Sequence, residues 1–220
     1  MPSILSTKNL YAEQQKAFRE AGIALLEYNA IKIKSVAFEM PETVENAIFT
    51  SKNAVKAVIN HSATAKEINN CFCVGTKTAK ILEKNGLKPL KISENATDLA
   101  HFIAKYHSEK SFYFFCGDNR RGELPEILKA KIIQFKEVIT YKTTLNTKQF
   151  DQDFDAVLFF SPSGIQSFVK TNDLGQKTAI CIGKTTAAEA RKYTGNIAIA
   201  DTTTVESVIE KAVELIENTD

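Results

Sequence analysis

Tryptophan is missing from this chain of 220 residues, and no apolar run approaches the roughly 20 residues that a transmembrane helix requires. The opening residues, "MPSILSTKNLYAEQQ", also lack the charged segment and long apolar core of a secretory signal peptide. Neither sign of charge dominates, because 28 lysines and arginines are balanced by 26 aspartates and glutamates. We therefore expect a cytoplasmic globular protein that binds neither nucleic acid nor membranes.

Cysteine is scarce, and its spacing does not fit a metal site. The four cysteines are Cys71, Cys73, Cys116 and Cys181, each in or beside an apolar run. Zinc ligands usually come as C-x₂₋₄-C paired with another such cluster or with histidines, and the three histidines here are scattered. Small buried hydrophobes in a reducing compartment are the simpler interpretation, so we predict no metal.

What the sequence does have is an alternation of apolar runs and segments of helical period. Runs such as "SILS" (3–6), "ALLEY" (24–28) and "AVLFF" (156–160) have the length of strands. Helices are expected over 12–21, 52–61, 76–85, 97–105, 124–134, 163–170 and 185–192, and after a capping box, "TTVE", at 203–206. This alternation indicates an α/β fold with parallel sheets flanked by helices.

Three stretches of the sequence occur twice, in the same order. The pairs are "AIFTSKNAVKAV" (47–58) with "LFFSPSGIQSFV" (158–169), "CVGTKTA" (73–79) with "CIGKTTA" (181–187), and "ATDLAHFI" (96–103) with "TTTVESVI" (202–209). The offsets between matched residues are similar, at 111, 108 and 106 positions. We interpret the chain as a duplication of one α/β domain.

The duplication does not run end to end. The strand, turn and helix within 1–28 have no counterpart just before 156, and 111–135 has none after 216. Because these two segments are of the same type, the first is expected to complete the second-half domain. The prediction is two intertwined domains, residues 1–34 with 144–220 and residues 36–142, joined by a two-stranded hinge at about 31–38 and 138–144.

Six expected strands end in small or polar residues at or near the start of a helix. These turns are 6–8, 50–53, 75–78, 117–122, 161–164 and 183–186. Ligands gather at the carboxyl ends of parallel strands, and helix N-termini offer unpaired N–H groups and a positive dipole end to anions. With two domains facing each other across a hinge, the turns are expected to line one cleft for an anionic ligand.

Each turn taken singly has a simpler explanation. Serine and threonine at helix starts most often cap the helix, Gly75 and Gly183 allow tight turns, and Arg120-Arg121 fits a solvated pair. Neither G-x-G-x-x-G nor G-x-x-x-x-G-K-[ST] is present, and "FFSPSG" (159–164) is not a G-x-S-x-G elbow. Nucleotide-phosphate loops therefore lack support, while a Ser-His-Asp triad stays open.

Six motifs occur together in this chain: "FTSKNAV", "CVGTKTA", a Cys-Gly turn followed by Arg121 and Leu124-Pro125, "VITYKT", "FFSPSG" and "CIGKTTA". In combination they resemble the motifs of the uroporphyrinogen-III synthase family, and the resemblance covers essentially the whole chain. It implies two intertwined α/β domains joined by a two-stranded ladder, which agrees with the layout inferred from the repeat.

The resemblance also implies an activity and a set of partners. Such an enzyme, a lyase of porphyrin and heme biosynthesis, converts the linear tetrapyrrole hydroxymethylbilane to uroporphyrinogen III. It removes water, inverts the last pyrrole ring and closes the macrocycle, with no cofactor or metal. Left alone, the substrate closes without inversion to the type I isomer. Positioning and electrostatic stabilisation of a cation are therefore expected to dominate, in a monomeric protein.

The family motifs carry site residues over to this chain. Tyr141 is the candidate for assisting departure of the hydroxyl group, against the alternative of a hinge tyrosine that only packs. Arg121 matches a basic position of the family, whereas Lys8 stands where an arginine is common, so bidentate pairing is lost there. The residues expected to bind the substrate's carboxylates are Thr7, Lys8, Thr50, Ser51, Lys52, Asn53, Gly75, Thr78, Gly117, Arg121, Ser161, Ser163, Gly164, Gly183 and Thr186.

Two other classes of function remain open. A non-catalytic two-domain protein that closes on an anionic small molecule fits the hinge, the cleft and the duplication equally well, and only the family motifs separate it from the enzyme. A pair of response-regulator-like signalling domains would need acidic clusters at the strand ends. The strand ends here are hydroxyl-rich and basic instead, which disfavours that class.

Overall fold

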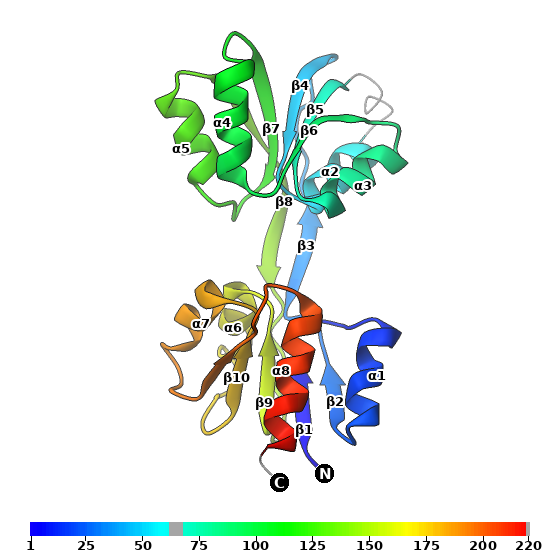
Figure 1. Cartoon of the computed structure of the whole chain (residues 1–220), viewed down its shortest axis with the longest axis vertical. Coiled ribbons are helices and arrows are strands. Elements are labelled where there is room, and N and C mark those ends of the chain that lie inside the picture. Colours follow the sequence, from blue (N-terminus) through cyan, green and yellow to red (C-terminus); the bar gives the residue numbers. More distant parts are fainter. Residues whose placement is uncertain (62–67, 219–220) are drawn as a thin grey trace. The chain divides into compact units, whose positions relative to one another are not determined.

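The protein folds into two compact units (Figure 1). The structure is a computed structural model that describes residues 1–61 and 68–218. Met1–Lys32 with Thr144–Asp220 form the first unit, called unit 1, and Ile33–Thr143 form the second, called unit 2. In each unit a sheet with a core of parallel strands is covered by helices on both faces, which confirms the expected α/β fold class.

The sheet of unit 2 has the order β3-β8-β7-β4-β5-β6, and its pairs β8-β7, β7-β4, β4-β5 and β5-β6 are parallel. Its strands are β3 (Ile31–Ser35), β4 (Val44–Phe49), β5 (Ile68–Val74), β6 (Pro89–Ser93), β7 (Ser111–Gly117) and β8 (Gln134–Leu145). Its helices are α2 (Lys52–His61), α3 (Thr76–Lys84), α4 (Ala96–Tyr106) and α5 (Glu123–Ala130).

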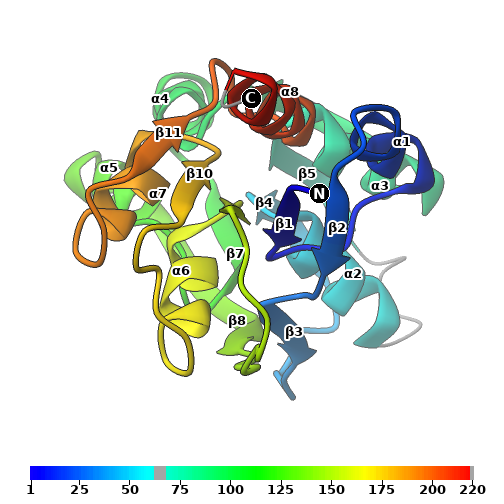
Figure 2. The same cartoon turned by 90° about the horizontal axis from the view of Figure 1, so that it is seen from below.

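The sheet of unit 1 is parallel throughout, in the order β11-β10-β9-β1-β2. Its strands are β1 (Ser3–Ser6), β2 (Ala24–Glu27), β9 (Ala156–Phe159), β10 (Thr178–Cys181) and β11 (Ile197–Ile199). Its helices are α1 (Ala12–Glu20), α6 (Pro162–Phe168), α7 (Lys184–Ala190) and α8 (Val205–Glu217). In Figure 2, α6 and α7 lie on one side of this sheet and α1 and α8 on the other.

Both units share one strand order. Counted from its own first strand, unit 1 reads 2-1-3-4-5 across the sheet, since β2, β1, β9, β10 and β11 lie side by side. Unit 2 has the same order with β7 in the place of β1 and β8 in the place of β2, so the chain enters it at the third strand. In this topology the connections diverge between strands 1 and 3, and ligands bind at the carboxyl ends there. That point is β1/β9 in unit 1 and β7/β4 in unit 2.

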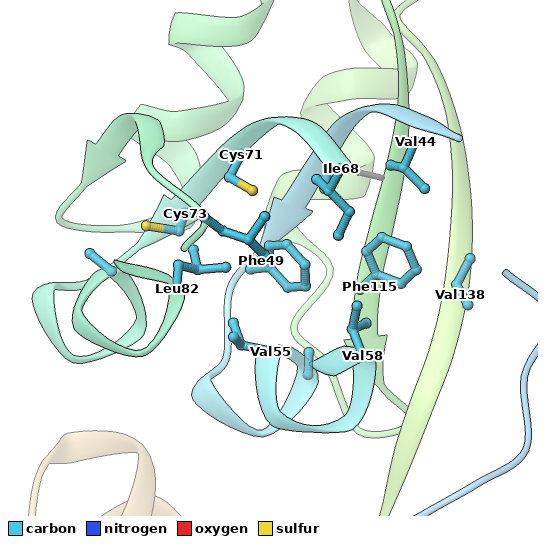
Figure 3. Packing of buried hydrophobic residues seen from close by; sticks show 14 residues of the cluster. Val44, Phe49, Val55, Val58, Ile68, Cys71, Cys73, Leu82, Phe115 and Val138 are labelled. Atoms are coloured by element: carbon cyan, nitrogen blue, oxygen red, sulfur yellow. The ribbon is translucent and has the colours of Figure 1, made fainter. Parts of the chain in front are cut away.

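Aromatic side chains hold the switch point of unit 2 in place. Phe49 at the end of β4 and Phe115 near the end of β7 are completely buried, and their rings stack with centroids 5.4 Å apart. Val55 and Val58 of α2 belong to the same buried cluster, which Figure 3 shows. Burying four such side chains contributes about 1.5–3 kcal/mol each. This packing fixes the first two turns of α2 against the two strand ends.

Two antiparallel strands connect the units. β8 runs without a break from Gln134 to Leu145, and β3 lies beside it in the sheet order. Val36 N–H donates to Thr140 C=O at 3.2 Å and Asn146 N–H donates to Ala30 C=O at 2.8 Å, so residue numbers rise along one strand as they fall along the other. The expected two-stranded connection is present, as part of a longer second strand than the sequence predicts.

One expected helix ends earlier than predicted. The sequence favours a helix over 124–134, but α5 ends at Ala130. The backbone of Ile132 is left-handed, with φ of 57°, and Ile133 N–H turns back to Leu128 C=O at 2.9 Å. Ile132 lies four residues after Leu128, so its spacing continues the helical pattern and conceals the end of the helix. Gln134 belongs to β8 instead.

The last helix also begins one residue later than the predicted capping box. Thr204, not Thr203, is the N-cap of α8, and its Oγ1 accepts a hydrogen bond from Ser207 N–H at 3.2 Å. The corresponding N-cap of α4 is Asn95, whose side chain accepts from Asp98 N–H at 2.8 Å. The two N-caps are 109 positions apart, close to the offsets of the other two repeated stretches.

This placement changes the register of the third repeat by three residues. With the N-caps matched, Leu99 corresponds to Val208 rather than to Val205, and both Leu99 and Val208 are completely buried. Three residues are nearly one helical turn, so the apolar stripe fits almost equally well in either register. The sequence pattern alone could not separate the two.

Candidate functional site

A pocket of about 380 Å³ opens at the switch point of unit 2. It is formed by residues at or just beyond the ends of β4, β5 and β7, by Tyr141 within β8, and by the starts of α4 and α5. Five of the residues expected in the site line it, namely Thr50, Ser51, Gly117, Arg121 and Tyr141. A pocket at this point of a parallel sheet is where the topology predicts a ligand.

Two hydroxyl groups meet in this pocket. The hydroxyl of Tyr141 donates to Oγ of Ser51 at 3.1 Å, from a half-buried position on β8. Ser51 directly precedes α2, and its Oγ also accepts from Asn53 N–H at 3.1 Å, as a helix N-cap does. Phenol and serine are therefore joined at a positive helix end, which favours negative charge on an oxygen there.

The two arginines of the β7–α5 turn have different partners. Arg120 is ion-paired with Glu137 of β8, and its Nε donates to Oε2 of that glutamate at 2.6 Å. Arg121 is exposed and, within the described residues, has no ion-pair partner. Arg121 is therefore the guanidinium of this pocket that remains available to pair with a ligand's carboxylate.

Carboxylates of the protein line the pocket too. Glu94 precedes α4 and Glu123 begins α5, and both are exposed. Asn95 also lines the pocket, but both ends of its side chain are engaged with Asp98, Oδ1 with its N–H at 2.8 Å and Nδ2 with its Oδ2 at 2.7 Å. Negative groups of a ligand are thus expected to prefer the side of Arg121 to the starts of α4 and α5.

The remaining expected residues of unit 2 lie outside the pocket. Lys52 and Asn53 form the first turn of α2, and Asn53 contributes its N–H to Ser51. Gly75 is the N-cap of α3, with a left-handed φ of 81° that favours glycine. Thr78 is only 5% exposed, so its hydroxyl offers little surface to a ligand.

In unit 1 the structure brings three expected residues together at the β1/β9 switch point. Thr7 is buried, and its Oγ1 donates to Leu158 C=O at 2.6 Å. Ser161 is the N-cap of α6 and accepts from Gly164 N–H at 3.2 Å. A side chain at Gly164 would place its Cβ 3.4 Å from Oγ1 of Thr7. The hydroxyls here serve the backbone, as the simpler explanation of such turns predicts.

The other expected residues of unit 1 are dispersed around these turns. Nζ of Lys8 lies 5.6 Å from the centroid of the Phe160 ring. Ser163 is half-buried in the first turn of α6, Gly183 is the extended N-cap of α7, and Thr186 is only 3% exposed. Their binding of carboxylates stays a prediction.

The cysteines are buried free thiols. Burial raises the pKa of Cys71 and Cys181 to about 12, and that of Cys73 and Cys116 to about 11. None is therefore an activated nucleophile at neutral pH. Across residues 1–61 and 68–218 no cluster of three or more His, Cys, Asp or Glu could hold a metal ion, and no helix is long and apolar enough to span a membrane.

A larger hollow, of about 800 Å³, carries none of the expected residues. It lies in unit 1 at the amino ends of β9 and β10, whereas the switch point lies at the carboxyl ends of the strands. Lys177, which lines it, is paired with Asp153 at 3.1 Å, and Asp155 accepts from Ser3 N–H at 2.7 Å. Its charged side chains thus have partners within the protein, so size alone does not make it the site.

Some pocket residues were missed by reasoning from the sequence. The start of α4, from Glu94 to Thr97, lines the pocket because β6 ends beside it at the same edge of the sheet. The polar run after "KPLKI" (88–92) is the signal that indicates it, because it has the same strand-to-helix form as the six turns expected to bind a ligand. Phe114 and Leu124, both almost completely buried, supply apolar wall and carry no such signal.

The fold is that of a duplicated α/β protein with a pocket at the switch point of one unit. The chain belongs to the uroporphyrinogen-III synthase family, because the family model described as uroporphyrinogen-III synthase HemD matches residues 12–210. The porphyrin biosynthesis protein HemD of Ruminiclostridium josui is 27% identical to it over 188 residues, which are 76% of this chain. The chain spans only 37% of that relative's length.

Solved structures show the same fold. The uroporphyrinogen-III synthetase of Helicobacter pylori 26695 superimposes with a TM-score of 0.77 at 21% identity, covering 98% of this chain and all of the other. A mutant uroporphyrinogen III synthase of the extremely thermophilic bacterium Thermus thermophilus gives a TM-score of 0.65 at 11% identity, with both chains fully covered. At these identities the likeness is one of fold.

Proposed function

We propose that this protein is a uroporphyrinogen-III synthase, a lyase that converts hydroxymethylbilane to uroporphyrinogen III with loss of water and inversion of the last pyrrole ring. Membership of the family supports the reaction. The observation that carries the proposal for this chain is the pair of hydroxyls, Tyr141 and Ser51, in a pocket at the switch point.

Tyr141 would act on the leaving hydroxyl group of the substrate. The carbon–oxygen bond of the hydroxymethyl group breaks, its electron pair leaves with the oxygen, and the phenol donates the hydrogen that turns the leaving group into water. The carbon left behind is a cation spread over its pyrrole. When the ring closes, the terminal pyrrole releases a proton, which restores the phenol, so that one water is lost overall.

Electrostatics and position supply the rest of the catalysis in this proposal. The oxygen of Tyr141 gains negative character as its hydrogen is given up, and the N-terminus of α2 lies beside it through Ser51. A volume of about 380 Å³ is near the lower end for small-molecule sites. It suits the reacting end of a tetrapyrrole rather than the whole molecule.

Carboxylates of the substrate are proposed to bind at Arg121 and at the hydroxyl-bearing turns of each unit. Arg121 is exposed at the pocket and free of ion pairs within the described residues, which supports its role. The two units are proposed to act as the domains 1–34 with 144–220 and 36–142. A cytoplasmic location and a monomeric state stay predictions, and the proposed chemistry needs no cofactor.

An isomer assay tests the function. Hydroxymethylbilane is made freshly by its synthase, this protein is added, and the products are oxidised and separated by chromatography as uroporphyrin I and III. We expect predominantly the III isomer. The I isomer alone, from folded protein, would overturn the proposal and favour the non-catalytic protein that binds an anionic small molecule.

A further inference from the structure

We propose that Gly117 and Ser51 are positioning residues for the phenol of Tyr141. The space above Gly117 that holds the ring, closed by the hydrogen bond to Ser51, is called the seat. In unit 1 the side chain of Thr7 fills the corresponding space. One of two duplicated tyrosines is thereby made available to a substrate. The inference deepens the proposed function and rests on it for the role of Tyr141, whereas the geometry of the seat stands independently.

The seat depends on the missing side chain of Gly117. A Cβ added there would lie 2.5 Å from Cζ, 2.6 Å from Cε2 and 2.8 Å from the hydroxyl oxygen of Tyr141. Contacts this short force the ring to move. Gly117 is not among the glycines with positive φ, so its backbone conformation is open to other residues. Glycine is needed here by the tyrosine ring, not by the turn.

A β-bulge turns Tyr141 toward this seat. Cys116 of β7 pairs with Ile139 of β8, and the next residue, Gly117, pairs with Tyr141, so that Thr140 is an extra residue in β8. Regular alternation would place Tyr141 on the face opposite Val138, three residues before it. The extra residue returns Tyr141 to the face of Val138, against the same buried cluster.

Ser51 fixes the end of the ring. Its Oγ accepts from both Asn53 N–H and the Tyr141 hydroxyl, which engages both lone pairs and leaves the serine hydrogen free to donate. If the serine instead donates to the phenol oxygen, the phenol hydrogen is free. Either arrangement leaves one hydroxyl hydrogen of the pair for an oxygen of the substrate, which is what removal of a hydroxyl group requires.

Unit 1 carries the same elements without the seat. Leu5 on β1 pairs with Leu26 on β2 as Phe115 on β7 pairs with Val138 on β8, and all four belong to the corresponding faces of their sheets. Because Leu5 corresponds to Phe115, Thr7, two residues after Leu5, corresponds to Gly117, two residues after Phe115. Thr7 is 6% exposed, and its hydroxyl is bonded to the backbone of β9.

The tyrosine of unit 1 is accordingly part of the core. Tyr28 stands two residues beyond Leu26, in the place of Tyr141, and is 6% exposed. Its ring packs edge-on against that of Phe150, with the ring centroids 5.0 Å apart. Its hydroxyl has no hydrogen-bond partner within the described residues. In unit 1 the side chain of Thr7 and a β2 strand without a bulge thus leave Tyr28 buried. In unit 2 Gly117 and the bulge in β8 leave its counterpart, Tyr141, half-buried beside the pocket.

Kinetics of the Gly117→Ala and Ser51→Ala variants test the inference. We expect kcat for uroporphyrinogen III to fall at least tenfold in each, with KM within twofold of wild type, because a displaced phenol weakens the reacting step rather than binding. Ser51→Thr keeps a hydroxyl at this position and should retain at least half of the wild-type kcat. A rise in KM with unchanged kcat would mean that these residues only hold substrate, and would overturn the inference.

Matched controls separate position from folding. Gly195→Ala changes an exposed glycine that meets nothing within 4 Å and has no positive φ, and it should leave kcat unchanged. Thr204→Ala removes a helix N-cap of the kind that Ser51 provides, but in α8 of unit 1. If Thr204→Ala lowers kcat as much as Ser51→Ala at a similar loss of melting temperature, Ser51 acts through stability and the inference fails.

A spectroscopic readout keeps the seat testable without turnover. The resonance of Tyr141 in protein labelled with ¹³C-tyrosine is identified as the one missing from Tyr141→Phe. Gly117→Ala and Ser51→Ala should shift it while the resonance of Tyr28 stays in place. If wild-type protein forms no III isomer but the shift is seen, the proposed function fails and the seat stands. An unmoved Tyr141 resonance in both variants overturns the seat itself.

Discussion

Tyr28, just after β2, and Tyr141, within β8, stand at corresponding positions of the two units, and of these two hydroxyls only that of Tyr141 has a hydrogen-bond partner within the described residues. We attribute the difference to the residue at the corresponding position of the neighbouring strand, which is Thr7 in unit 1 and Gly117 in unit 2. The two units thus share one strand order, but this position is buried in unit 1 and lines a pocket in unit 2.

Replacement of Tyr141 by phenylalanine should reduce kcat for uroporphyrinogen III by about 10²-fold or more, the scale of one general acid. The fold should persist, because loss of one half-buried hydrogen bond costs about 1 kcal/mol. Tyr28→Phe is the matched control and should keep wild-type kcat. Isomer-resolved kinetics of both variants make the comparison, and full activity of Tyr141→Phe would remove the phenol from the mechanism.

Tyr28 should make the stability of the protein fall at high pH. Burial raises its pKa from 10.0 to about 12, so the unfolded chain loses this proton first as the pH rises. Its contribution to the free energy of unfolding is complete below pH 10 and is lost by about pH 12, with about 1.4 kcal/mol gone at pH 11.

Urea unfolding of wild type and of Tyr28→Phe at pH 8 and pH 11 measures this loss. The cysteines with raised pKa values are common to both proteins, so their effect cancels in the difference. At pH 8 the variant should be about as stable as wild type or more so, because the hydroxyl it lacks has no partner in the described part of the chain. An equal fall in both proteins between the two pH values would contradict the burial of the phenol.

Arg121 and Arg120 should respond differently to replacement by alanine. Arg121→Ala should raise KM several-fold with little change in kcat, because an exposed guanidinium is lost from the pocket. Arg120→Ala breaks the ion pair with half-buried Glu137 and should lower the melting temperature instead. Steady-state kinetics and thermal unfolding distinguish them, and a loss confined to kcat for Arg121→Ala would contradict simple carboxylate binding.

The thiols should be unreactive in the folded protein. Burial raises the pKa of all four cysteines to about 11 or 12, so at pH 8 they are protonated as well as shielded. Titration with a chromogenic disulfide reagent should detect no reactive thiol in native protein and all four in urea. Rapid reaction of Cys73 or Cys116 in the native protein would show that the strands near the pocket open readily.

The sequence was informative about the fold because the signals were redundant. Apolar runs, glycine stops such as Gly22 and Gly86, and the repeated stretches each pointed to the same alternation of strands and helices, and both glycines have the left-handed φ that a helix stop favours. It was less informative where a pattern had two solutions. The helical spacing continues past the end of α5, so the helix is predicted to reach residue 134, and in the third repeat the apolar spacing fits two registers.

The family motifs selected residues that the structure separates into different roles. Thr7, Ser161 and Gly164 satisfy the backbone at the switch point of unit 1, while Ser51 and Gly117 line the pocket of unit 2. A serine before a helix looks the same in both places along the sequence. The group that faces the serine hydroxyl comes from a strand that is distant in the sequence, as Tyr141 of β8 does for Ser51.

The sequence by itself determined the class of fold, the duplication and the family, because these depend on periodicity and on motifs that are local in the chain. Tertiary structure decided which tyrosine is available. The contact of Gly117 with Tyr141 arises from the register between two strands and one extra residue in β8. Strand register depends on packing across the whole sheet, and so no short stretch of sequence determines it.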